Sequence, residues 1–177
     1  MTTTSASYAR SSATRFPVAV DAALRTAGWE PGRWDIKQAE YWADALRDHT
    51  TPAGHRHTVF PAAVEAWAEF GNLTVTAPGP GRQIAPAAIR LDPLTGLHLA
   101  RTFADLGRAL STQLCPLGVE AGTDPAGGGS HLALDREGRV YCVDHTGDWY
   151  LGASLDEALT LLLTGLQPTR LTTGQTG

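Results

Sequence analysis

The pattern of apolar and polar positions divides the chain into a helical first part and a strand-rich second part. Up to residue 71, apolar residues recur every three or four positions and predict three helices, over residues 16–28, 35–48 and 61–71. Asp35, with Gln38 three positions later, has the pattern of a capping box at the start of the second helix. The residues expected on the inner faces of these helices are Val20, Leu24, Ala27, Ile36, Ala39, Trp42, Ala43, Leu46, Val64, Trp67, Ala68 and Phe70.

Beyond residue 72 the period of the pattern shortens to two, which predicts short strands. Strands are expected at residues 73–76, 88–91, 117–120, 131–134, 139–143 and 149–151. The hairpin is the clearest signal, because two alternating runs flank the polar tip 135–138, which ends in glycine. Two more helices are expected, over residues 102–114 and 154–165, and the second starts with the capping-box pair Ser154 and Glu157.

This order of elements predicts a single α+β domain, with a mainly antiparallel or mixed central sheet of five to six strands and helices packed around it. The 177 residues suffice for one domain with a substantial core, which we place at residues 15–166. Residues 1–14 and 167–177 lack apolar periodicity and are expected to be disordered tails. The glycine-rich residues 122–130 are expected to form a mobile loop between two strands.

Composition indicates a cytoplasmic protein with no membrane partner. No apolar run is long enough to span a bilayer, and the Thr/Ser-rich N-terminus lacks the apolar stretch of a secretory signal. Cys115 and Cys142 are too few for a disulfide framework or a zinc site. They are expected to be half-buried thiols, although the sequence also allows a single bridge between them. Arginine supplies every basic residue except Lys37, a bias typical of a bacterium with high genomic GC content.

Charge is distributed unevenly along the chain. The net charge of -4 argues against direct binding of nucleic acid. Residues 119–157 nevertheless hold eight acidic residues against only Arg136 and Arg139. The acidic residues are Glu120, Asp124, Asp135, Glu137, Asp144, Asp148, Asp156 and Glu157. Such a segment either attracts a basic partner or forms a solvated edge that keeps the strands soluble.

Candidate catalytic groups are sparse. His55 and His57 would share one face of a strand, which allows the hypothesis of a metal-assisted hydrolase. The nearest further ligands are Asp44, Asp48 and His49, and the spacing matches no known metal motif. Residues 144–146 place Asp, His and Thr side by side, where strand alternation gives poor geometry for a catalytic pair. No nucleophile elbow, phosphate-binding loop or His-Glu-x-x-His motif occurs, so we predict a protein without catalytic residues or cofactor.

The sequence favours a partner-binding surface over a catalytic site. Trp149 and Tyr150 are neighbours in a predicted strand, so they face opposite sides and one is expected to lie outside the core. Exposed aromatic residues beside acids are typical of interface hot spots, although packing at a strand edge is the alternative. The predicted partner-binding residues are Asp135, Glu137, Asp144, Asp148, Trp149 and Tyr150. Exposed strand edges leave a monomer or a weak homodimer as the oligomeric state.

The chain resembles the SUKH superfamily, and its third subfamily in particular. The segments that carry the resemblance occur in order over residues 15–165. They are Arg15-Phe16-Pro17, Ala27-Gly28-Trp29-Glu30-Pro31-Gly32-Arg33, Phe60-Pro61, Glu69-Phe70-Gly71, Cys115-Pro116-Leu117-Gly118, Leu134-Asp135-Arg136-Glu137-Gly138-Arg139-Val140-Tyr141, Leu151-Gly152 and Leu163-Thr164-Gly165.

This resemblance implies an α+β fold with a central sheet and helices around it. It also implies an immunity protein of a bacterial polymorphic toxin system, often encoded beside a nuclease or a nucleic-acid deaminase. Such a protein binds its cognate toxin and blocks the toxin's active site. The family shares no catalytic residues and binds through a variable surface, so no contact residue transfers by motif. The alternative within the same fold is a regulatory or scaffold protein that is not an enzyme.

Overall fold

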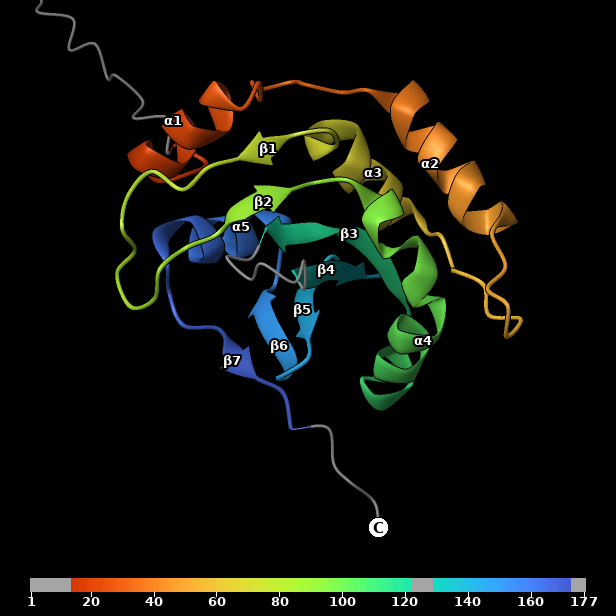
Figure 1. Cartoon of the computed structure of the whole chain (residues 1–177). Helices are drawn as coiled ribbons and strands as arrows, with labels where there is room; N and C mark the ends of the chain where they lie inside the picture. Colours follow the sequence, from red (N-terminus) through yellow and green to blue (C-terminus); the bar gives the residue numbers. More distant parts are fainter. Residues whose placement is uncertain (1–13, 122–128, 173–177) are drawn as a thin grey trace, which may run out of the picture.

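A computed structural model of the chain describes residues 14–121 and 129–172 (Figure 1). Parts of three predicted segments therefore lie outside the described residues. They are residues 1–13 of the N-terminal tail 1–14, residues 122–128 of the glycine-rich loop 122–130 and residues 173–177 of the C-terminal tail. Within the described residues, no helix is long and apolar enough to cross a membrane.

One antiparallel sheet organises the fold, and each strand pairs with the next strand in sequence. The helices are α1 (Val18–Thr26), α2 (Ile36–Asp48), α3 (Pro61–Phe70), the 3-10 helix η1 (Pro93–Leu99), α4 (Ala100–Ala109) and α5 (Leu155–Thr164). The strands are β1 (Thr74–Val75), β2 (Ala88–Arg90), β3 (Leu114–Ala121), β4 (Ser130–Asp135), β5 (Val140–Asp144), β6 (Gly147–Gly152) and β7 (Thr169–Arg170). The predicted α+β class is confirmed, and the described sheet has seven strands rather than five or six.

The unexpected strand is β7, which lies in the segment predicted to be a disordered C-terminal tail. Thr169 pairs with Tyr150 and Arg170 with Trp149, which places β7 at the edge of the sheet. Both residues of β7 are exposed, so the strand forms by backbone pairing without an apolar pattern. The prediction failed here because periodicity reports buried side chains and not backbone hydrogen bonds.

The helix predicted over residues 102–114 was also placed wrongly. It starts earlier, as η1 followed by α4, and Asp92 caps η1 by accepting a hydrogen bond from the amide of Leu94. Helix α4 ends at Ala109, because Ser111 adopts a left-handed conformation with φ of 56°. Leu114 begins β3 instead of ending the helix, although its apolar side chain continues the helical pattern.

The two faces of the sheet carry separate apolar clusters. The larger cluster lies under α1, α3 and α5, and α2 packs against α3 from outside. Trp67 of α3 is buried in this cluster, and its indole Nε1 donates to the carbonyl oxygen of Pro116 in β3 at 3.0 Å. The smaller cluster, around Phe103, Leu106 and Tyr141, lies under α4 on the other face. The sheet therefore has two packed faces, and its strand ends are the places where polar groups can gather.

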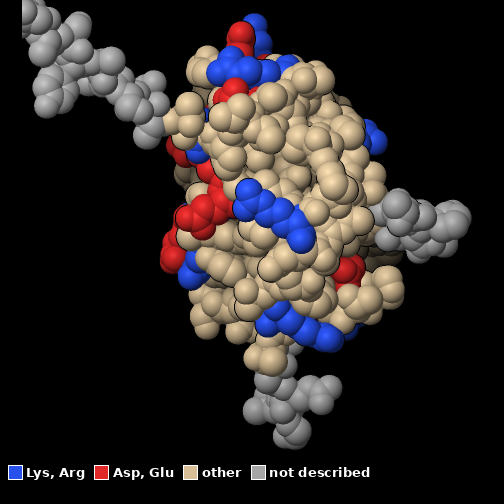
Figure 2. Space-filling model, turned by 90° about the vertical axis from the view of Figure 1, so that its left-hand side faces the viewer, with Lys and Arg blue, Asp and Glu red and all other residues tan. Residues whose placement is uncertain are grey.

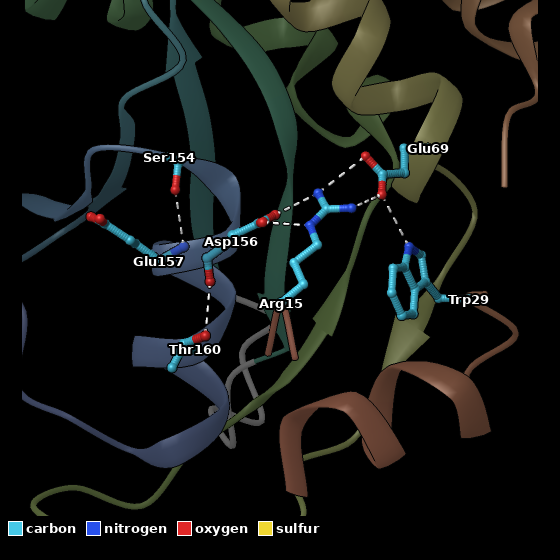
Figure 3. A network of polar contacts seen from close by, with 7 residues as sticks. All are labelled: Arg15, Trp29, Glu69, Ser154, Asp156, Glu157 and Thr160. Carbon is cyan, nitrogen blue, oxygen red and sulfur yellow. Dashed lines mark hydrogen bonds and ion pairs between the residues drawn. The ribbon is translucent and has the colours of Figure 1, made fainter. Parts of the chain in front are cut away.

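Arg15 joins the first, third and last helices on the larger face (Figure 3). Its guanidinium donates two hydrogen bonds to Asp156 of α5, at 2.5 and 2.7 Å, and two to Glu69 of α3, at 2.5 and 3.3 Å. The same guanidinium lies over the rings of Phe16, Trp29 and Phe70, with centroid distances of 5.2 to 5.9 Å. Hydrogen bonds to Asp156 and Glu69 raise the pKa of Arg15, against the effect of its partial burial.

Arg15→Lys is expected to destabilise the protein by about 1 kcal/mol, since lysine keeps the charge but cannot bridge two carboxylates with a planar fork. Urea unfolding of both proteins measures the difference. Arg101→Lys is the control, because Arg101 forms only an exposed pair with Asp105 at 3.7 Å and should change stability little. Equal effects of the two substitutions would show that the bridge adds nothing to stability.

Gly165→Ala is expected to cost more stability than Gly138→Ala, although both glycines have positive φ, 66° and 84°. At Gly138 nothing lies within 4 Å of an added Cβ, so only backbone strain of about 1 kcal/mol is expected. At Gly165 the Cβ would overlap the carbonyl oxygen of Ile84 and lie 2.6 Å from the Cα of Gly81, so a loss of about 3 kcal/mol is expected. Thermal unfolding compares them, and equal losses would contradict the close approach of these segments.

Candidate functional site

The predicted partner-binding residues lie at two opposite ends of the sheet. Asp135 ends β4 and Glu137 lies in the tip that follows it, whereas Asp144, Asp148 and Trp149 lie around the turn from β5 to β6. Strand β5 separates these two turns by its five residues, or about 15 Å of extended chain. The structure therefore does not join the acidic segment into one surface.

Asp135 is engaged within its own hairpin, which argues against its predicted role as a partner contact. Its side chain is fully buried, with an exposed fraction of 0%. The carboxylate accepts hydrogen bonds from the amides of Glu137 and Arg139, the guanidinium of Arg139 and the hydroxyl of Tyr141, at 2.6 to 3.1 Å. These donors use its acceptor positions within the hairpin. Glu137 differs, because 70% of its side chain is exposed beside Arg139.

Trp149 and Tyr150 face opposite sides of the sheet, as predicted. Trp149 packs against the larger apolar cluster and Tyr150 against the smaller one, where its ring meets Tyr141 at 5.8 Å. Both rings are half-buried, so neither stands outside the core as had been expected for one of them. By the strand register, Asp144 lies on the face of Trp149, and Asp148 on the face of Tyr150.

A pocket of about 200 Å³ opens on the Trp149 side of this sheet end. Glu120 and Asp144 line it with carboxylates, Cys142 with a thiol and Trp149 with an aromatic ring. The remaining wall comes from the segment 84–86, Leu151 of β6, Leu162 of α5 and the segment 166–168 that follows α5. We call this the acidic pocket, and it contains two of the six predicted residues, Asp144 and Trp149.

The wall opposite the sheet is held in place by backbone hydrogen bonds. The amide of Arg82 donates to the carbonyl of Thr164, and the amides of Gln83 and Ile84 both donate to the carbonyl of Gly165, each at 2.9 Å. The connection between β1 and β2 is thereby fastened to the end of α5. The pocket is therefore formed in the folded chain before any partner arrives.

Glu120 is the residue of this pocket that sequence reasoning missed. Within the described residues, the only hydrogen bond to its carboxylate comes from Cys142 Sγ, at 3.7 Å. Burial raises the pKa of Glu120, the hydrogen bond from Cys142 opposes this, and the charge of Asp144 raises the pKa further. Burial also raises the pKa of the Cys142 thiol, which keeps it protonated. Strand alternation could have placed Glu120 on a face, but only the register brings it beside Cys142 and Asp144.

Asp144 is held as an ionised acid by the turn that it caps. Its Oδ1 accepts from the amide of Thr146 at 2.7 Å and from the amide of Gly147 at 3.1 Å, and its Oδ2 accepts from Ser130 at 3.3 Å. Burial alone would raise the pKa of Asp144, but hydrogen bonds from Thr146, Trp149 and Gly147 lower it overall. Burial and the charge of Asp144 raise the pKa of Asp148.

Neither His55 nor His57, the histidines of the hydrolase hypothesis, lines the acidic pocket. His57 is buried, and its Nε2 lies 2.7 Å from the carbonyl oxygen of Leu97. Burial lowers the pKa of His57, which favours the neutral ring. The described part of the chain contains no group of three or more His, Cys, Asp or Glu residues that could hold a metal ion. Cys115 and Cys142 are both buried free thiols, so the bridge between them is not formed.

Glu120→Gln is expected to stabilise the protein at pH 7 and to have no effect near pH 4. Because the folded state raises the pKa of Glu120 above 4.5, its favourable protonated form is present below that pH and is lost as the pH rises through the raised value. Thermal unfolding between pH 4 and 8 measures the difference from the parent. Glu40→Gln, at an exposed position of α2, serves as the control. A difference that does not grow with pH would contradict the burial of a charge at Glu120.

Comparison with known proteins identifies the family of this chain. A family model described as SUKH-3 immunity protein matches residues 16–165. No curated protein and no solved structure matches the chain. The matched region begins at the buried Phe16 before α1 and ends at Gly165, which closes α5, so it includes every helix and all strands except β7. The chain therefore belongs to the SUKH-3 immunity protein family.

Proposed function

We propose that this chain neutralises a toxin that acts on nucleic acid, a deaminase or a nuclease, by covering the toxin's active site. Family membership implies an immunity function and a cognate toxin as partner. The acidic pocket is the observation that carries the finer proposal. An enzyme that grips nucleic acid presents basic side chains to phosphates, and Glu120 and Asp144 would take the place of phosphate groups on such a surface.

Neutralisation requires tight binding, because a small free fraction of a catalytic toxin remains harmful. A Kd near 1 nM corresponds to about 12 kcal/mol and usually needs an interface of about 1,600 Å². The acidic pocket alone is too small, so we place the rest of the interface on the adjoining side of the molecule. This side, over α1, α5 and the connection from β1 to β2, has a mostly uncharged surface, with charged side chains near its middle and along its margins (Figure 2). Val18, with 82% of its surface exposed, and Ile84, with 41%, belong to these elements.

Apolar and charged groups have different roles in such an interface. Apolar contact supplies most of the affinity, and the carboxylates attract the basic partner and set its orientation. The edge strands β1 and β7 have only two residues each, which offers little backbone for pairing between copies. This supports a stoichiometric complex of one monomer with one toxin domain.

Co-expression with the cognate toxin, which we expect the neighbouring gene to encode, tests the proposal. We expect a stable complex on co-purification, restored growth of the host and loss of the toxin's deaminase or nuclease activity in vitro. A toxin without activity on nucleic acid would contradict the finer proposal and leave the immunity function in place. Absence of both complex and rescue would favour the regulatory or scaffold alternative.

Asp144→Asn is expected to weaken the complex about 10-fold or more, because it removes a charge-assisted contact. Asparagine keeps a side-chain oxygen that can accept the turn's hydrogen bonds, so the fold should be retained. Glu137→Gln, at the opposite end of the sheet, is the matched variant and should bind like the parent. Calorimetry or surface plasmon resonance measures both. If Glu137→Gln weakened the complex and Asp144→Asn did not, the interface would lie at the hairpin tip instead.

A further inference from the structure

The acidic pocket has the size and lining for one long side chain. Its volume of about 200 Å³ admits one long side chain. Ile84, Pro86, Leu162 and Leu166 give it apolar walls, while Glu120 and Asp144 supply charge. Apolar walls suit the methylene stem of an arginine or a lysine, and the acids suit its charged end.

The carboxylates of this sheet end have no cationic partner among the described residues. The nine ion pairs of that part of the chain include neither Glu120, Asp144 nor Asp148. Glu120 Oε2 has only the thiol contact at 3.7 Å, and Asp144 Oδ2 accepts from Ser130 at 3.3 Å. Half-buried carboxylates without an ion pair leave acceptor positions that a cation can use.

The aromatic wall favours arginine over lysine. Trp149 already accepts a guanidinium within the chain, because Cζ of Arg170 lies 5.6 Å from the centroid of its ring. That guanidinium hydrogen-bonds the carbonyl oxygen of Thr146, at 2.8 Å, and not the acids of the pocket. A planar guanidinium stacks on an aromatic face and carries five N–H donors, enough for two carboxylates, whereas an ammonium is a point charge with three.

We propose that the acidic pocket receives one arginine side chain of the toxin, whose guanidinium pairs with Glu120 and Asp144 and packs against Trp149. This inference rests on the proposed function, and it names the chemical group that the pocket recognises. The arginine is an anchor at the edge of a larger, mostly uncharged interface. A toxin that uses this arginine to bind a phosphate of its substrate would lose activity while the arginine is held in the pocket.

The pocket can be tested without the toxin by titration with N-acetyl-arginine methylamide. The readout is the indole N–H signal of Trp149 in nitrogen-15 NMR, assigned by its loss in Trp149→Phe. We expect a saturable shift with a Kd on the order of 1 mM. The matched ligand is N-acetyl-citrulline methylamide, which has nearly the same shape but no charge and should not bind. Glu120→Gln should weaken arginine binding about 10-fold, whereas Glu40→Gln should leave it unchanged.

The complex provides the second test through double-mutant cycles. Glu120→Gln is combined with single Arg→Gln substitutions in the toxin encoded beside this gene. For one arginine, we expect each single substitution to weaken binding about 10-fold and the double variant to be no weaker than either. Circular dichroism and thermal unfolding confirm that the variants are folded. Sedimentation velocity of the immunity protein alone shows whether a second copy fills the pocket instead.

Each outcome has a distinct meaning. Equal shifts with citrulline, or no saturable shift, would overturn the recognition of a guanidinium by this pocket. An acetyl-lysine methylamide that binds as well as the arginine compound would overturn the choice of arginine. A toxin complex in which no arginine couples to Glu120 would overturn the anchor while the proposed function stands. Failure to form any complex would reject the proposed function, and the ligand titration would still decide the chemistry of the pocket.

Discussion

The pairing of every strand with its successor is the constraint on which the rest of this structure depends. In such a sheet, consecutive turns lie at alternate ends, so the tip after β4 and the turn after β5 point in opposite directions. The same rule brings the end of β3 and the start of β4 to the end where β5 turns into β6. Glu120, Ser130 and Asp144 meet there across three adjacent strands, beside Trp149.

Two acidic residues of this sheet differ in the hydrogen-bond donors around them, and this difference indicates which one is structural and which one can bind a partner. Asp135 is fully buried, yet four donors of its own hairpin satisfy it, so it stabilises the tip. Glu120 is less buried, but among the described residues its only donor is the thiol of Cys142, and burial raises its pKa. A group that disfavours the folded state at neutral pH fits a binding role, because functional sites commonly reduce stability. The acidic pocket is thus a better candidate for partner contact than the hairpin tip, where Arg139 pairs with both acids.

An immunity protein of this construction separates two tasks in space. The larger apolar cluster, Trp67 and the Arg15 bridge hold α1, α3 and α5 on one face of the sheet. The outer surface of α1 and α5 and the connection fastened to Gly165 remain available for a partner. Because these surface residues contribute little to the core, they can vary with the partner while the fold is kept.

The sequence by itself determined the α+β class, most elements and the helix starts at Asp35 and Ser154, because periodicity and capping are local. It also gave the family resemblance and the opposite orientation of Trp149 and Tyr150. Only the tertiary structure decided which acids come together, since that depends on register between strands. Glu120 joined the site and β7 appeared through contacts between segments distant in sequence. Asp135 left the site because the folded hairpin turns four of its own donors toward the carboxylate, which apolar periodicity does not report.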